Sequence, residues 1–132
     1  MVQIKNMKTI NERVIKSKKN QDKLLDFIKI TYELLYDQLL IRPNVDPNKI
    51  LEIDASVCKI SIIITSIRDD VQLLLDTCQF NENETMSDET YNYTNEYTLR
   101  IYTKTEQLLI DGNMYFSKCI GIINNIKNSI QL

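Results

Sequence analysis

The sequence predicts an all-α fold: one domain, residues 1–132, forming an elongated antiparallel bundle of three long helices at about residues 7–40, 47–80 and 88–131. The chain holds only two Gly and two Pro, whereas sandwiches and barrels need turn residues every ten residues or so. Its apolar residues recur at steps of three and four over long stretches, which is the period of a helix. Two polar loops separate these stretches and set the number of helices.

The first loop contains both prolines. Pro43 disfavours helical backbone at Arg42, so the first helix is expected to end before it. Asp46 and Pro47 then read as an N-cap followed by proline at the first helical position. The second loop is polar and acidic, residues 81–86, and Ser87 after it reads as the cap of the third helix.

The first helix has its clearest apolar pattern in its second half. Five residues at steps of three and four form one stripe: Leu25, Ile28, Tyr32, Leu35 and Leu39. The first half is sparser, with Ile10 and Val14 followed by three lysines. We therefore expect that end of the helix to fray or to project.

The second helix carries the strongest signal, a coiled-coil seam at alternating steps of four and three. Its eight positions are Ile53, Val57, Ile60, Ile64, Ile67, Val71, Leu74 and Cys78. Ile62, Ile63, Leu73 and Leu75 add apolar surface outside the seam. This breadth predicts a central helix, roughly 50 Å long, that is buried on more than one side.

The third segment allows two interpretations. Its Tyr and Thr residues between positions 91 and 103 fit a strand period of two, but a single strand would have no partner in this chain. Helical steps link Tyr91, Thr94, Thr98, Ile101, Thr105 and Leu108, and continue through Gly112, Tyr115, Cys119, Ile123, Ile126 and Ile130. We expect a helix, either continuous with a close helix crossing at Gly112 or broken there to give a four-helix bundle.

The composition excludes many kinds of active site. The chain has no His, which removes histidine-based acid–base catalysis, nucleophilic dyads and His-ligated metals. Gly112 and Gly121 are isolated, so no phosphate-binding loop is present. The carboxylate pairs Glu33/Asp37 and Asp69/Asp70 are expected at opposite ends of the bundle. We predict no catalytic, cofactor-binding or metal-binding residues and no enzymatic activity.

The three cysteines, Cys58, Cys78 and Cys119, form no C-x-x-C pair, so we expect reduced thiols rather than disulfides or a zinc site. Residues 1–20 contain no signal-peptide core, and no apolar run approaches the length of a membrane span. These features predict an intracellular, cytoplasmic protein. The abundance of Ile, Asn and Lys beside a single Ala is typical of an AT-rich genome.

Tyrosine is the residue type whose abundance points to a function. Five of the seven tyrosines lie in the third segment. Helical geometry spreads these rings around the helix, so some must be exposed, and exposed Tyr is enriched at protein interfaces. The predicted partner interface consists of Tyr91, Tyr93, Tyr97 and Tyr102.

Charge is unevenly distributed along the chain. Residues 1–23 carry a net charge of +5, although the whole chain carries −2. The bases of this segment form a candidate basic patch: Lys5, Lys8, Arg13, Lys16, Lys18, Lys19 and Lys23. Such an end of the chain is able to contact nucleic acid or another anionic surface, although the acidic isoelectric point weighs against it.

The function predicted from these features is a non-enzymatic protein–protein interaction module: an assembly subunit, adaptor or inhibitor that works through helical packing. Its partner is either a different protein or a second copy of the chain, since the second helix has surplus apolar surface. The alternative is nucleic-acid or anionic-surface binding through the basic segment. No cofactor is expected.

Overall fold

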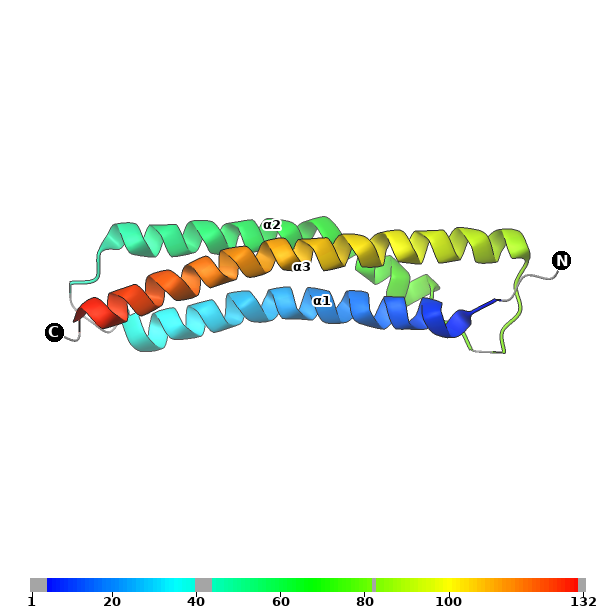
Figure 1. Ribbon diagram of the computed structural model, residues 1–132, viewed down its shortest axis with the longest axis horizontal. Helices are drawn as coiled ribbons and strands as arrows, with labels where there is room; N and C mark the ends of the chain where they lie inside the picture. Colours follow the sequence, from blue (N-terminus) through cyan, green and yellow to red (C-terminus); the bar gives the residue numbers. More distant parts are fainter. Residues whose placement is uncertain (1–4, 40–43, 82, 131–132) are drawn as a thin grey trace.

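The computed structural model describes residues 5–39, 44–81 and 83–130, and it is a bundle of three helices (Figure 1). Helix α1 spans Met7–Leu34 and continues into a π-helical turn, η1, at Leu35–Leu39. Helix α2 spans Pro47–Thr77 and α3 spans Asp88–Ile130. The predicted helix ends at 40 and 131, and the expected break at Arg42–Pro43, lie outside the described residues.

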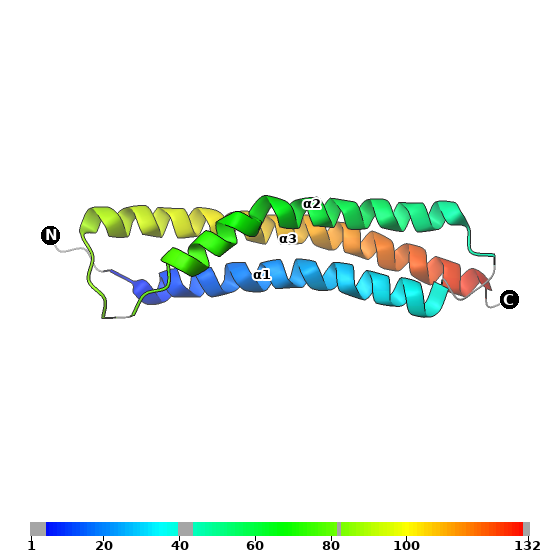
Figure 2. The same cartoon turned by 180° about the vertical axis from the view of Figure 1, so that it is seen from behind.

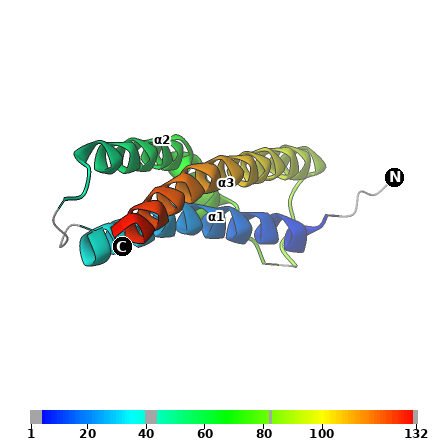
Figure 3. The ribbon, with the colours of Figure 1, turned by 60° about the vertical axis from the view of Figure 1, so that its left-hand side comes forward.

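The helices alternate in direction along the chain, so α1 and α3 are parallel to each other and α2 is antiparallel to both (Figure 1). Each helix packs against the other two, which confirms the all-α, three-helix bundle. Figure 3 shows α3 running obliquely, with its last turns beside the end of α1. Side chains from all three helices meet there in one cluster that includes Leu35, Ile53 and Ile123.

The predicted caps form where the sequence places them. The Asp46 side chain accepts a hydrogen bond from the Asn48 N–H at 2.9 Å, with Pro47 at the start of α2. The Ser87 hydroxyl accepts one from the Thr90 N–H at 3.1 Å. Both bonds satisfy amide donors that a helix start otherwise leaves unpaired.

The predicted seam of α2 is confirmed, because all eight of its positions are buried. The expectation that α2 is buried on more than one side is wrong. Leu51 and Ile62 are each 63% exposed and Leu73 is 47% exposed on the outer face of the helix. In a three-helix bundle the two neighbours of a helix lie toward one side of it, so its opposite face meets solvent.

The seam of α1 differs from the predicted stripe. Its buried positions keep steps of three and four from Met7 to Leu24, then step by seven to Thr31, and they include the polar residues Ser17, Gln21 and Thr31. Leu25, which the sequence places on the apolar stripe, is 46% exposed. Seven-residue spacing, rather than polarity, decides which α1 residues face the other helices.

The first turns of α1 do not fray or project, contrary to expectation. Met7 and Ile10 are buried against Tyr91 of α3, and Phe80 and Met86 from the α2–α3 connection cover the same cluster. The Asn11 side chain ties this connection down: its amide donates to the Phe80 carbonyl at 2.6 Å, and its carbonyl accepts from the Phe80 N–H at 2.9 Å. The start of α1 is therefore held at the bundle end.

Helix α3 is continuous through Gly112, so the alternative of a four-helix bundle is wrong. Gly112 is buried, and a Cβ atom at this position would overlap Cδ2 of Leu24 on α1. The expected close crossing is thus confirmed. Absence of a side chain at Gly112 lets α3 approach α1 at the point where Leu24 is fully buried.

Helix α2 bends in its second half, where it turns toward α1 and away from the first part of α3 (Figure 2). Two hydroxyls back-bond in this region: Thr65 donates to the Ser61 carbonyl at 2.9 Å, and Ser66 donates to the Ile63 carbonyl at 2.6 Å. Such bonds compete with the backbone ladder and bend helices. The bend leaves part of the surface of α3 uncovered by α2.

Candidate functional site

Four residues near the start of α3 form an exposed cluster, here called the tyrosine–arginine surface: Tyr93, Glu96, Tyr97 and Arg100. The rings of Tyr93 and Tyr97 are parallel to within 3°, with centroids 6.2 Å apart. The Arg100 guanidinium lies 5.3 Å from the Tyr97 ring centroid. The four side chains line a shallow hollow of about 190 Å³.

Tyr97 anchors this surface to the fold. Its ring packs on a core cluster that contains Leu74 and Cys78 of α2. Burial, reinforced by the nearby carboxylate of Asp70, raises the pKa of Tyr97 above its ordinary value. Tyr93 is 71% exposed and rests on this fixed ring, which presents a flat apolar face to solvent.

The other two tyrosines of the predicted interface lie elsewhere. Tyr91 is only 6% exposed, and its hydroxyl accepts a hydrogen bond from the Asn6 N–H at 3.0 Å. Tyr91 is a core residue. It lies two residues before Tyr93, which places the two side chains on nearly opposite sides of α3. Tyr102 lies under the Lys16 ammonium at 6.0 Å, and burial together with Glu106 raises its pKa. The structure therefore brings together only Tyr93 and Tyr97.

Arg100 is a member of the site that the sequence interpretation missed. It follows Tyr97 by three residues and Tyr93 by seven, which places all three on one face of α3. That spacing is visible in the sequence, but a tyrosine excess alone does not draw attention to the cation beside it. Arg and Tyr are among the residues most enriched at the energetic centres of interfaces.

Three of the seven bases of the candidate basic patch have partners within the chain. Lys5 pairs with Asp88 at 3.2 Å and also donates to the Met86 carbonyl. Arg13 is turned toward α3, where it donates to the side chain of Asn95 at 2.7 Å. Lys18 pairs with Asp22 at 3.0 Å. The remaining bases are the exposed Lys8, Lys16, Lys19 and Lys23.

Polar residues instead connect α1 to α3 inside the bundle. The Asn20 amide donates to the Thr105 hydroxyl at 3.2 Å and to the Glu106 carboxylate at 2.8 Å. Arg13 also donates to the Thr98 hydroxyl at 3.3 Å. Buried polar groups that require specific partners penalise shifted alignments of two helices. The buried threonines Thr98 and Thr105 therefore help to fix the register of α3 on α1.

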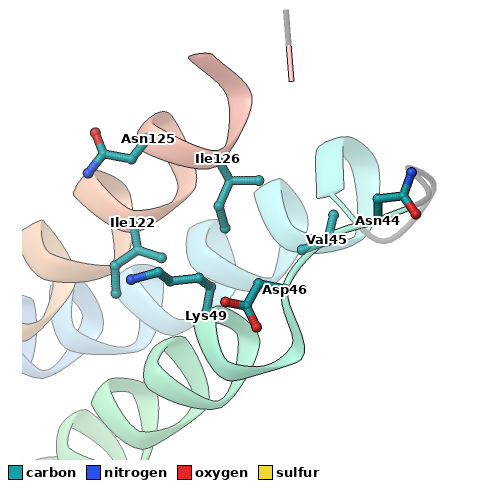
Figure 4. Close-up of a pocket in the computed structure, with 7 residues that line it drawn as sticks. All are labelled: Asn44, Val45, Asp46, Lys49, Ile122, Asn125 and Ile126. Atoms are coloured by element: carbon teal, nitrogen blue, oxygen red, sulfur yellow. The ribbon is translucent and has the colours of Figure 1, made fainter. Parts of the chain in front are cut away.

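A hollow of about 390 Å³ lies at the end of the bundle that holds the α1–α2 connection (Figure 4). Its apolar wall is formed by Val45, Ile122 and Ile126. The charged groups on its rim have local partners, because Asp46 caps α2 and Lys49 pairs with Glu52 at 3.6 Å. These charges serve the first turn of α2 and give the hollow no convergent polar set for a ligand.

A second, open groove of about 560 Å³ runs between α1 and α3. Phe27, Ile30, Leu109 and Ile110 supply most of its apolar lining. Phe27 also stacks on Phe116 at 4.5 Å between ring centroids. Within residues 5–39, 44–81 and 83–130, no group of three acidic or cysteine side chains is arranged to hold a metal ion.

The three thiols differ in accessibility: Cys58 is exposed, whereas Cys78 and Cys119 are buried. Burial raises the pKa of Cys119, and its thiol donates a long hydrogen bond to the Ile53 carbonyl at 3.7 Å. The thiolate, not the thiol, is the nucleophile. Cys119 should therefore resist alkylation for two reasons: its thiol is buried, and its raised pKa disfavours the thiolate.

We expect iodoacetamide at neutral pH to alkylate Cys58 in the folded protein while Cys78 and Cys119 remain unmodified. In denaturant all three should react, and mass spectrometry of proteolytic fragments measures each site. Alkylation of Cys119 in the folded state at the rate of Cys58 would contradict its burial between α2 and α3.

None of the helices, over the residues that the structure describes, has a stretch both long and apolar enough to cross a membrane. Comparisons with protein-family models, with curated proteins and with solved structures find no match to this chain.

Proposed function

We propose that this chain is a protein–protein interaction module that binds a protein partner through the tyrosine–arginine surface. The observation that carries the proposal is the stacked pair of the exposed Tyr93 and the half-buried Tyr97, with Arg100 beside it. Two aromatic rings held in place by packing offer apolar contact area at little entropic cost. The guanidinium supplies hydrogen-bond donors at the edge of that area.

The position of this surface also supports the proposal. It lies beside the end of α2, where Tyr97 packs on the cluster that contains Leu74 and Cys78, on a helix rather than on a loop. Interfaces concentrate their binding energy in a few Tyr, Trp and Arg side chains surrounded by weaker contacts. A subunit, adaptor or inhibitor with one such centre needs no catalytic group.

The test is affinity purification from cells of the native organism with three matched baits: the unmodified chain, Tyr93→Ala and Tyr36→Ala. Tyr36 is 61% exposed and lies on η1, so it controls for loss of an exposed ring. We expect at least one protein to be captured by the unmodified and Tyr36→Ala chains and to be lost, by tenfold or more in mass-spectrometric intensity, with Tyr93→Ala. Equal capture by all three baits, or no specific capture by any, would exclude this surface as the binding site.

A further inference from the structure

We propose that two copies of this chain associate through the outer face of α2, aligned antiparallel about a twofold axis between Ala55 and Cys58. The outer stripe of α2 consists of Leu51, Ala55, Cys58 and Ile62, all exposed. It contains no charged residue and lies on the side of α2 opposite the buried seam. This surface is separate from the tyrosine–arginine surface, so the inference does not depend on the proposed partner.

The spacing of the outer stripe is the same in both directions along the helix, with steps of four, three and four. A twofold axis at its midpoint therefore matches every residue of the stripe with another. Leu51 of one copy meets Ile62 of the second copy, and Ala55 meets Cys58. Large side chains form the two outer layers and small ones the two inner layers, which allows the helix axes to approach closely at the centre.

Charge complementarity favours this antiparallel alignment. Glu52 and Lys59 are seven residues apart, so they lie on the same flank of the outer stripe, and both are exposed. Glu52 also forms an exposed ion pair with Lys49 of its own helix, at 3.6 Å. About the same axis, Glu52 of one copy lies within two residues of the level of Lys59 in the other, and the symmetry repeats the pair. In a parallel, in-register dimer, Glu52 would instead lie level with Glu52 of the second copy and Lys59 with Lys59, so that like charges would face each other.

The extent of the contact is limited by the bend of α2. Leu51 to Ile62 spans about 17 Å along a straight helix, and Leu73 lies beyond the back-bonded residues Thr65 and Ser66, where α2 turns toward α1 (Figure 2). Four layers form a smaller interface than the roughly 1,200–2,000 Å² of a standard stable complex. We therefore expect a weak dimer, with a dissociation constant in the micromolar range or above.

Sedimentation velocity over a concentration series tests the dimer. We expect the unmodified chain to pass from monomer to dimer below about 1 mM, and Ile62→Lys to raise the dissociation constant at least tenfold. Leu73→Lys is the matched control, since it adds the same charge to an exposed apolar position on the same helix. Circular dichroism should show both variants folded. A monomer throughout the series, or equal effects of the two lysines, would overturn the proposal.

Charge reversal tests the register. Glu52→Lys and Lys59→Glu should each weaken the dimer severalfold, and the double variant should restore it, because the two charges exchange places across the interface. Ala55→Cys places a second thiol opposite the native Cys58, so mild oxidation should give a disulfide-linked dimer in high yield. Failure of the double variant to recover association would contradict the antiparallel alignment. None of these results bears on capture of a partner by Tyr93.

Discussion

Replacing Ile60 by Ala is expected to lower the free energy of unfolding by about 2–5 kcal/mol, the cost of a cavity at a fully buried aliphatic position. Ile60 has no exposed surface, and it packs with Leu24, Ile64 and Ile67 in the middle of the bundle. Domains of this size are stable by only about 5–15 kcal/mol. This single truncation therefore removes a large share of the total stability.

The matched control is Ile62→Ala, which removes the same atoms two residues away. Ile62 is 63% exposed on the outer face of α2, so its truncation should change the free energy of unfolding by no more than about 0.5 kcal/mol. Urea denaturation followed by circular dichroism, at concentrations where the chain is monomeric, measures both values. Equal losses would mean that the buried face of α2 has been misassigned.

Replacing Gly112 by Ala should destabilise the protein, although Ala is normally the better residue in a helix. The added methyl group would overlap Cδ2 of the buried Leu24. The Leu24 side chain must therefore change its rotamer inside the core, or α1 and α3 must separate, at about 1–3 kcal/mol. The higher helix propensity of Ala offsets about 1 kcal/mol of this cost, so we expect a net decrease in the free energy of unfolding.

Gly121→Ala is the control for that experiment. A Cβ atom at Gly121 meets no neighbouring atom within 4 Å, and the residue is exposed on the same helix. It should therefore stabilise the protein by about 0.5–1 kcal/mol through helix propensity alone. Thermal unfolding of the two variants should shift in opposite directions. A stabilised Gly112→Ala protein would contradict the close crossing of α1 and α3.

The parts of the fold that the sequence predicted are those in which one periodic pattern dominates. The α2 seam repeats Ile, Val and Leu at heptad spacing, and every position in it is buried. The starts of α2 and α3 were predicted as well, because Asp46 followed by Pro47, and Ser87, are residue types that favour helix N-termini.

The errors came from assigning residues to the core by polarity. Ser17, Gln21 and Thr31 occupy seam positions of α1, while the apolar Leu25 faces solvent. Ser17 and Thr31 are satisfied within α1, because their hydroxyls donate to backbone carbonyls four residues earlier. Asn20 instead depends on another helix, where its partner is Thr105. That partner is far away in the sequence, so periodicity within one helix does not reveal it.

The candidate site was predicted in part. Exposure of Tyr93 follows from helical geometry, whereas the burial of Tyr91 depends on how far α1 extends beside α3. The position of Arg100 depends on Tyr97, whose ring is held against Leu74 and Cys78 of α2. Both are tertiary features, set by how three helices of different length pack together.

We propose that this chain acts by presenting Tyr93, Tyr97 and Arg100 to a protein partner. Isothermal titration calorimetry of the purified partner with the unmodified chain and with the Tyr93→Ala and Tyr36→Ala variants tests this proposal. We predict that Tyr93→Ala weakens binding by about 2 kcal/mol, roughly 30-fold, as expected for an interface centre, while Tyr36→Ala binds like the unmodified chain. Unchanged affinity of a folded Tyr93→Ala protein would contradict the claim.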